Sequence, residues 1–372
     1  MISATMYEYQ KPLKIEDVTR KPTITNGQQV LVKVGATGLC HSDLHLINGD
    51  WKNSIPLQLP IVLGHEISGY IEEVGNMVPA GLFAKGDMVV VFGGWGCGVC
   101  IYCKSGNEQM CNFAKWPGIM TDGGFAEYVL VESYRFLAKV QGENNNSNTN
   151  RQSNETKLRI EEVAPLTDAG LTPYRAVKKV RHLLGPGKTI AVFGIGGLGS
   201  YAVQYAKILG QSANVIGLDV NDDKLQLAEM MGADFTINIS RYKASFSSSD
   251  NGLKEEVLKI TERKGVDVVI DCVGAEETVL NSVKILGKGG TVVLVGLFSN
   301  QMNGIPLVTS VINEYSIIGS IWGNYNELCE VIELAKNKKI KHKIRRFGLT
   351  EINDAISLLK DGHIIGRAVI SP

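Results

Sequence analysis

The pattern of apolar and polar residues changes along the chain. Up to about residue 140, short apolar runs alternate with Gly, Pro, Asn and Asp at close intervals, which is typical of β-strands joined by turns. Gln29–Val34, Ile67–Val74 and Met88–Phe92 are such runs. Because the predicted strands are short and closely spaced, we expect a curled, barrel-like sheet with long loops in this part of the chain.

From about Leu171 onward, continuous β-branched runs alternate with helical periodicity. Thr189–Phe193 predicts a buried strand, and Gly199–Leu209 predicts a helix with one apolar face. This alternation predicts a parallel sheet covered by helices on both faces. The remaining predicted elements are strands at Asn214–Leu218, Val266–Ile270 and Thr291–Val295, helices at Lys224–Met231, Glu327–Lys336 and Ile352–Lys360, and a last strand at Gly366–Ile370.

The segment Gln141–Lys157 fits neither pattern. Asn, Ser, Thr and Gln fill it, and it has no large apolar side chain. Since such a segment cannot bury apolar surface, it predicts a flexible surface loop.

Length and composition limit the kind of protein. A chain of 372 residues is longer than one typical core, so two domains are expected. It has no apolar run of transmembrane length, and Met1–Lys14 lacks the layout of a signal peptide, which predicts a cytoplasmic protein. Lys and Arg number 38, and so do Asp and Glu, so charge gives no reason to expect nucleic acid or an anionic membrane as a partner.

A glycine-rich motif follows the predicted strand Thr189–Phe193 directly. Gly194 would permit the tight turn, Gly196 would let the backbone approach a pyrophosphate, and Gly199 would allow close packing of helix on strand. The start of the next helix would offer N–H groups to the anion. The predicted cofactor contacts of this motif are Gly194, Gly196, Gly197, Leu198 and Gly199.

Asp219 lies twenty residues after Gly199, at the end of the next predicted strand. Its carboxylate would accept hydrogen bonds from the ribose hydroxyls of a dinucleotide and would repel a 2′-phosphate, so NAD is predicted rather than NADP. The alternative is that Asp219 caps the following helix, which is a common role for Asp.

Four of the seven cysteines lie close together, and zinc favours four ligands in a tetrahedron. A site made of four thiolates has no open position for a substrate, so it predicts a structural metal. Unmetallated cysteines on a loop are the alternative. The four residues are Cys97, Cys100, Cys103 and Cys111.

A catalytic metal needs about three protein ligands and an open position. Three segments offer candidate ligands: Cys40 beside two histidines, the pair His65 and Glu66 after Gly64, and Asp168. Their spacing alone does not bring them together, and packing in the core is the alternative for each of them.

These motifs, taken in order, resemble the zinc-containing, NAD-dependent medium-chain alcohol dehydrogenases. The resemblance extends from Cys40 to Arg367. It implies that Cys40, His65 and Asp168 hold a catalytic zinc, with Glu66 as a neighbouring or alternate ligand. The third ligand is Cys in some members of the family and Asp in others.

The same resemblance implies a proton relay and further cofactor contacts. The hydroxyl of Ser42 would receive the proton of the alcohol, and His45 would pass it to solvent by way of the cofactor ribose. Trp51, Trp95 and Trp116 could line an apolar substrate pocket, although ordinary packing explains them equally well. The further cofactor contacts that we expect are His41, Lys224, Gly296, Leu297 and Arg367.

The expected protein is therefore an α/β enzyme with two zinc ions and NAD. Residues 1–170, completed by 323–372, would form a barrel-like, GroES-like catalytic domain, and 171–322 a doubly wound Rossmann domain. The expected reaction moves a hydride between a primary or secondary alcohol and NAD in a homo-oligomer, either a dimer or a tetramer. The alternatives are a polyol, sugar or formaldehyde-type zinc dehydrogenase of the same superfamily and, from another class, a non-catalytic protein on this fold.

Overall fold

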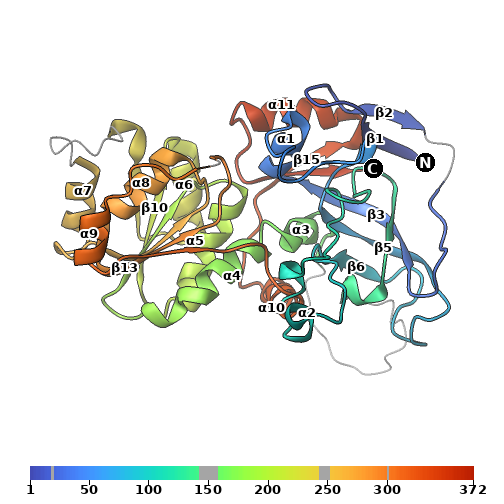
Figure 1. The fold of residues 1–372 in the computed structure, drawn as a ribbon, viewed down its shortest axis with the longest axis horizontal. Coiled ribbons are helices and arrows are strands. Elements are labelled where there is room, and N and C mark those ends of the chain that lie inside the picture. Colours follow the sequence, from blue (N-terminus) through green and yellow to red (C-terminus); the bar gives the residue numbers. More distant parts are fainter. Residues whose placement is uncertain (18–20, 142–157, 243–251, 300) are drawn as a thin grey trace. The chain divides into compact units, whose positions relative to one another are not determined.

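The computed structural model describes residues 1–17, 21–141, 158–242, 252–299 and 301–372. They form two compact units (Figure 1): unit 1 is Met1–Leu171 with Gly323–Pro372, and unit 2 is Thr172–Trp322. The Asn-rich segment 142–157 lies outside the described residues, so the predicted loop stays a prediction. Among the described helices, none is long and apolar enough to cross a membrane.

Unit 2 is built on a six-stranded sheet in the order β11-β10-β9-β12-β13-β14, and every neighbouring pair is parallel. Numbered along the chain, the strands stand in the order of a Rossmann fold, as predicted. The strands are β9 (Thr189–Phe193), β10 (Asn214–Asp219), β11 (Phe235–Asn238), β12 (Val266–Asp271), β13 (Leu286–Leu294) and β14 (Ser316–Gly319). The helices are α4 (Leu171–Val180), η4 (Arg181–Leu183), α5 (Gly197–Leu209), α6 (Asp222–Met231), η5 (Ile239–Arg241), α7 (Gly252–Ile260), α8 (Glu276–Lys284) and α9 (Leu307–Ile312).

Helices cover both faces of this sheet. Leu253 and Val257 of α7 and Val283 of α8 share one core cluster with alternate residues of β9 and β10, among them Ile216. The next residue along the strand, Gly217, faces the other way, because successive side chains of a strand alternate. A Cβ at Gly217 would lie 2.8 Å from Ala228 of α6. Helix α6 therefore covers the opposite face from α7 and α8.

Unit 1 contains a seven-stranded sheet and a small three-stranded sheet. The larger runs β15-β16-β3-β5-β6-β8, with β7 paired to β3, and the smaller runs β2-β1-β4. Apart from β15 and β16, the pairs are antiparallel. The strands are β1 (Ile2–Met6), β2 (Lys14–Asp17), β3 (Val30–Leu39), β4 (Ile61–Val62), β5 (Glu66–Val74), β6 (Met88–Val91), β7 (Tyr128–Val131), β8 (Leu137–Gln141), β15 (Ile344–Gly348) and β16 (Arg367–Ser371).

The last part of the chain completes unit 1. Strand β16 pairs with β3 on one side and with β15 on the other, so the sheet joins segments that are more than three hundred positions apart. The helices of unit 1 are short at the site and longer near the C-terminus: α1 (His41–Asn48), α2 (Ile101–Lys104), η1 (Glu108–Met110), η2 (Tyr134–Phe136), α3 (Ile160–Val163), η3 (Ala164–Thr167), α10 (Tyr325–Lys336), η6 (Leu349–Glu351) and α11 (Ile352–Lys360).

Two strands are longer than the apolar pattern predicts. We expected β3 to end at Val34, but it continues to Leu39 through Gly35 and Gly38. Likewise we expected β13 to begin at Thr291, but it begins at Leu286, because glycines interrupt the apolar pattern in its first half. In both strands glycine interrupts the apolar pattern although the backbone pairing continues, and at Gly38 a neighbouring side chain occupies the space of the missing Cβ.

Candidate active site

Cys40 stands at the junction of β3 and α1. It is the N-cap of the helix, and its backbone N–H donates a hydrogen bond of 2.8 Å to Oδ2 of Asp43. An acceptor side chain three residues into a helix satisfies one of the N–H groups that the first turn leaves unpaired. The thiol of Cys40 is thereby fixed at the end of a buried strand.

His65 is placed by the residue before it. Gly64 has a φ of +92°, and a Cβ there would come within 2.7 Å of the ring of Phe125, so only glycine suits this position. Nδ1 of His65 lies 3.4 Å from Oδ1 of Asp43, whose other oxygen holds Cys40. Asp43 thus orients both a thiol and an imidazole, and this leaves Nε2 of His65 to face a metal.

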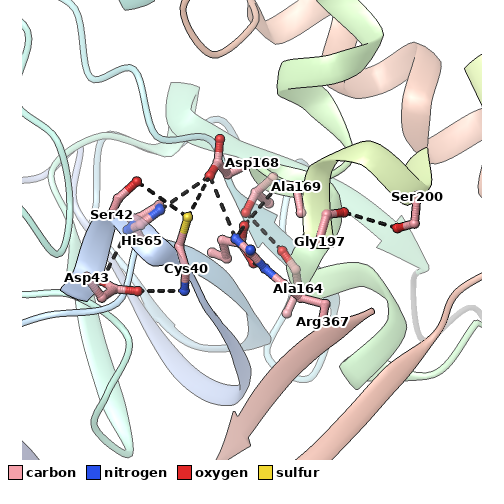
Figure 2. A network of polar contacts seen from close by, with 12 residues as sticks. Cys40, Ser42, Asp43, His65, Ala164, Asp168, Ala169, Gly197, Ser200 and Arg367 are labelled. Atoms are coloured by element: carbon pink, nitrogen blue, oxygen red, sulfur yellow. Dashed lines mark hydrogen bonds and ion pairs between the residues drawn. The ribbon is translucent and has the colours of Figure 1, made fainter. Parts of the chain in front are cut away.

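Asp168 completes the group. It follows the short helix η3, and its Oδ2 lies 3.4 Å from Nε2 of His65 and 3.7 Å from Sγ of Cys40. Figure 2 shows these three side chains pointing toward one another. The edges of a zinc tetrahedron with ordinary bond lengths would be about 3.4 Å for N–O and about 3.6 Å for S–O. The two distances from Asp168 therefore match the edges of a zinc tetrahedron, and all three ligand atoms lie within 4.8 Å of one another.

Glu66 lies behind this group and is fully buried. Its Oε1 accepts a 2.9 Å hydrogen bond from the N–H of Ala169, and both of its oxygens contact the guanidinium of Arg367. A Cβ at Gly38 would overlap the carboxylate of Glu66, which explains the glycine in β3. A carboxylate oxygen of Glu66 also lies within 4.8 Å of the ligand atoms of Cys40, His65 and Asp168.

The buried charges of this group call for a cation. Burial raises the pKa of Glu66 to about 7 even though Arg367 opposes the rise. Burial disfavours the charged form of His65, but Asp43 and then Asp168 raise its pKa well above the usual range. The raised pKa values mean that His65 and Glu66 hold protons more tightly than usual. A divalent cation can replace these protons, because metal binding displaces protons from its ligands.

The four predicted zinc cysteines lie together in a second group. Their sulfurs are all within 4.8 Å of one another. Sγ of Cys103 lies 3.5 Å from that of Cys100 and 3.9 Å from that of Cys97. These distances are far longer than a disulfide and close to the edge of a zinc–thiolate tetrahedron, which is about 3.8 Å. Burial raises the pKa of Cys103 to about 12, so this thiol needs a bound cation to be a thiolate.

Ser42 and His45 lie one turn apart on α1, so they share a face of the helix. The hydroxyl of Ser42 is 3.4 Å from Sγ of Cys40. Nδ1 of His45 is 2.7 Å from Oδ2 of Asp50. The structure therefore places Ser42 beside the predicted metal, and its role in a relay stays a prediction.

The glycine-rich turn of unit 2 has the properties that the motif predicts. Gly194 has a φ of +81°, and Gly196 is the N-cap of α5 with open space around its missing Cβ. At Gly199 a Cβ would overlap the carbonyl of Gly194, so helix and turn are packed closely. Gly197 and Leu198 form the first turn of α5, where a helix leaves backbone N–H groups without intrahelical partners. Their contact with a pyrophosphate stays a prediction.

Asp219 does not cap the helix that follows it. The N-cap of α6 is Asn221, whose side chain accepts from the N–H groups of Asp223 and Lys224. Asp219 instead accepts 2.7 Å and 3.0 Å hydrogen bonds from the N–H groups of Ile195 and Asn221. A carboxylate has about four acceptor sites, so it can still bind a ribose hydroxyl. The alternative that we gave for Asp219 is therefore wrong.

The other predicted cofactor residues are spread over both units. Gly296 follows β13, and a Cβ there would overlap the backbone of Val273, so the loops after β12 and β13 are packed together. Leu297 beside it is exposed. Lys224 is half-buried on α6, and His41 is exposed at the start of α1. Contacts of these residues with a cofactor stay predictions, as does one for Arg367.

Our prediction from the sequence missed the role of Asp43. It is fully buried and holds both Cys40 and His65. The signal was present, because an acidic residue three positions after an N-cap suggests a capping box, and a capping box identifies Cys40 as the start of a helix.

Two of the three predicted pocket tryptophans, Trp51 and Trp95, stack on other aromatic rings. Trp95 is buried, stacks on Phe136 with the ring centroids 5.7 Å apart, and donates its N–H to the carbonyl of Phe92 at 2.7 Å. Trp51 stacks on His45 with ring centroids 4.8 Å apart. Contact of either residue with a substrate stays a prediction.

Two family models match the chain. The model of an alcohol dehydrogenase GroES-like domain matches residues 26–142, and that of a zinc-binding dehydrogenase matches residues 197–337. The first lies within unit 1. The second extends through most of unit 2 and into α10.

Full-length relatives are also found. The chain is 39% identical, with 100% of each chain covered, to an NAD-dependent alcohol dehydrogenase of Sulfurisphaera tokodaii. It is 34% identical to a D-arabinose 1-dehydrogenase (NADP(+)) of Saccharolobus solfataricus, covering 100% of this chain and 97% of that one. A crystal structure of an alcohol dehydrogenase from Aeropyrum pernix has a TM-score of 0.89 and 37% identity, with 100% of each chain covered.

Proposed function

Because the chain belongs to the family of zinc-dependent, NAD-linked alcohol dehydrogenases, we propose that it interconverts small primary or secondary alcohols with aldehydes or ketones. In this proposal Cys40, His65 and Asp168 hold the catalytic zinc, with Glu66 as neighbour or alternate ligand. Cys97, Cys100, Cys103 and Cys111 hold the structural zinc.

The observation that carries the proposal is the spacing of three buried ligand atoms. The distances of 3.4 Å and 3.7 Å from Asp168 to His65 and Cys40 match the edges of a zinc tetrahedron. One tetrahedral position is then left for a substrate oxygen, and this open position distinguishes a catalytic site from the four-cysteine site. When bound, zinc supplies a Lewis acid that acidifies an alcohol or polarises a carbonyl, and NAD supplies the hydride acceptor.

The residues around the ligands keep them in place. Asp43 holds the N–H of Cys40 and the imidazole of His65, so neither ligand must be reoriented when substrate arrives. Arg367 balances the charge of Glu66, which otherwise would lie buried without a cation. Ser42, beside Cys40, takes the proton of the alcohol, and His45, one turn further along α1, carries it toward solvent.

NAD binding is assigned to unit 2. The N–H groups of Gly197 and Leu198 bind the pyrophosphate, and Asp219 accepts the ribose hydroxyls. Lys224, Gly296 and Leu297, together with His41 and Arg367 of unit 1, make further contacts with the cofactor. The open space at Gly196 supports this assignment, because a side chain there would keep the pyrophosphate away from the backbone.

Replacing Asp219 with Ser should weaken NAD binding and relax the discrimination against NADP. Ser removes the negative charge that repels a 2′-phosphate, so we expect KM for NAD to rise about tenfold and KM for NADP to fall. Steady-state kinetics with both cofactors measure this change. Asp267→Ser, an aspartate of β12 that pairs with Lys188, is the control. An unchanged ratio of the two KM values would show that Asp219 does not bind the ribose.

A sugar or polyol is the second candidate substrate. The relative of Saccharolobus solfataricus that acts on D-arabinose is 34% identical over the whole chain, so the same scaffold accommodates a polar substrate there. A formaldehyde adduct requires the same metal and cofactor chemistry. Pocket polarity separates these substrates, because each sugar hydroxyl needs its own hydrogen-bond partner.

One experiment tests the proposed function as a whole. Zinc per chain is measured by elemental analysis, and NADH formation is followed with short primary, secondary and cyclic alcohols, sorbitol, D-arabinose and a formaldehyde–thiol adduct. Two zinc ions per chain and turnover of the simple alcohols support the proposal. Turnover of the sugars or of the adduct alone would favour the second candidate. One zinc ion and no turnover would overturn the assignment of Cys40, His65 and Asp168.

We also propose that the chain acts in the cytoplasm as a homo-oligomer, either a dimer or a tetramer. Strand β14 lies at the edge of its sheet, and the preceding helix α9 exposes its apolar residues Leu307, Val308, Val311 and Ile312. Exposed apolar surface of this kind is often covered by another chain. Light scattering coupled to gel filtration measures the mass directly.

A further inference from the structure

The end of helix α1 brings Asp50 back to His45. Gly49 has a φ of +79°, which closes the helix in the left-handed conformation. The N–H of Asp50 then donates to the carbonyl of His45 at 3.0 Å, and Oδ2 of Asp50 lies 2.7 Å from Nδ1 of the imidazole. The carboxylate is held to the ring by the local fold of the helix end.

Trp51 holds the same ring from its face. The two rings stack with their centroids 4.8 Å apart and an interplanar angle of 24°. The side chain of His45 is only 15% exposed, whereas that of Asp50 is 43% exposed. The imidazole is thus covered on one face by Trp51 and held at Nδ1 by Asp50, whose own side chain reaches solvent.

The chemistry of the pair determines the tautomer of His45. An ionised carboxylate is an acceptor only, so Nδ1 of the neutral ring must carry the proton that it donates to Asp50. The lone pair then resides on Nε2. A histidine whose tautomer and orientation are fixed in this way accepts a proton at one defined atom.

We propose that Asp50 and Trp51 are positioning residues for proton transfer, which hold His45 as the Nδ1–H tautomer and stabilise it once it is charged. The proposal rests on the relay of Ser42 and His45 described above and adds residues to it. In alcohol oxidation Ser42 gives its proton toward Nε2 of His45 and takes the proton of the substrate, whose hydride goes to NAD. The imidazolium, paired with Asp50, then loses one proton to water and returns to its neutral form.

Three variants of Asp50 and one control test the proposal. Asp50→Ala removes the carboxylate, Asp50→Asn keeps its shape without its charge, and Asp50→Glu restores the charge on a longer side chain. Asp17→Asn changes the charge equally at a residue whose side chain is 81% exposed and pairs with the N-terminal amine. We expect Asp50→Ala to lower kcat for alcohol oxidation about tenfold to a hundredfold with little change in KM, and Asp50→Glu to recover part of the loss.

His45→Ala separates the proposal from the function on which it rests. If His45→Ala lowers kcat and the double variant with Asp50→Ala loses nothing more, the two residues act as one unit, as we propose. If His45→Ala lowers kcat but Asp50→Ala does not, Asp50 has no positioning role and the relay stands. If His45→Ala leaves kcat unchanged, the relay itself is wrong.

A spectroscopic measurement detects the positioning directly. The nitrogen shifts of ¹⁵N-labelled histidines distinguish the two neutral tautomers, and His45→Ala assigns the signal among the six histidines of the chain. We expect the Nδ1–H tautomer in the zinc-loaded enzyme and a mixture of tautomers in Asp50→Ala. An unchanged tautomer in Asp50→Ala, with zinc content and Tm as in the parent protein, would overturn the proposal.

Discussion

Replacing Cys40 with Ala is expected to lower kcat/KM for alcohols at least about a thousandfold while the fold stays intact. The change removes one of three ligands, and a catalytic metal contributes several kcal/mol to transition-state stabilisation, of which about 4 kcal/mol corresponds to that factor. The thiol is buried between Asp168 and Ser42, and Ala cannot replace it as a ligand. His65→Ala should have the same effect. Steady-state kinetics and zinc content per chain, which should fall from two to one, measure the result.

The control for this prediction is Cys329→Ala. Cys329 is half-buried on α10 and belongs to neither metal group of the described residues. It should leave zinc content and kcat/KM unchanged. Circular dichroism of Cys40→Ala should match that of the parent protein. Retained activity in Cys40→Ala with one zinc ion lost would mean that the lost ion is not catalytic.

Among the substitutions proposed here, Cys103→Ser is expected to lower the free energy of unfolding most. Cys103 is buried in the four-cysteine group, and a hydroxyl binds zinc far more weakly than a thiolate does. Because zinc binding supplies folding free energy to such sites, we expect the free energy of unfolding to fall by at least about 4 kcal/mol and Tm by about 10 °C. Differential scanning calorimetry measures Tm, and elemental analysis should find about one zinc ion per chain.

The loss should concentrate in the loop that the metal joins. Limited proteolysis should cut Cys103→Ser within residues 97–111, where the parent protein resists cleavage. No new cut is expected near Cys40, His65 or Asp168. Cys272→Ser, at a half-buried cysteine of unit 2 that belongs to neither metal group of the described residues, is a control for removing a thiol. An unchanged Tm and two zinc ions in Cys103→Ser would show that the four cysteines do not hold a metal.

What the sequence could predict depended on how local each signal was. Strand β9 is an uninterrupted apolar run followed at once by Gly194, so both the strand and the cofactor turn follow from neighbouring residues. The four cysteines lie within fifteen positions, which gives a metal site without any knowledge of the fold.

The catalytic group could not be assembled in the same way. Cys40 and Asp168 are 128 positions apart, and the packing of η3 against β3 and β5 brings their segments together. Only the resemblance to a family joined them beforehand. The contact between Asp50 and His45 could not be predicted for another reason. It depends on the left-handed conformation of Gly49 and does not correspond to a recognised sequence motif.

The pairing of Glu66 with Arg367 has a consequence for folding during translation. Glu66 leaves the ribosome 301 residues before its partner, and all of unit 2 is made in between. A buried carboxylate without a cation is unfavourable, so the segment around Glu66 should remain open to solvent until β16 arrives. Unit 2 can fold while it is being translated, whereas unit 1 can complete its fold only after residues 323–372 have been synthesised. The nascent chain is therefore expected to bind dinucleotide before it can close the site for zinc.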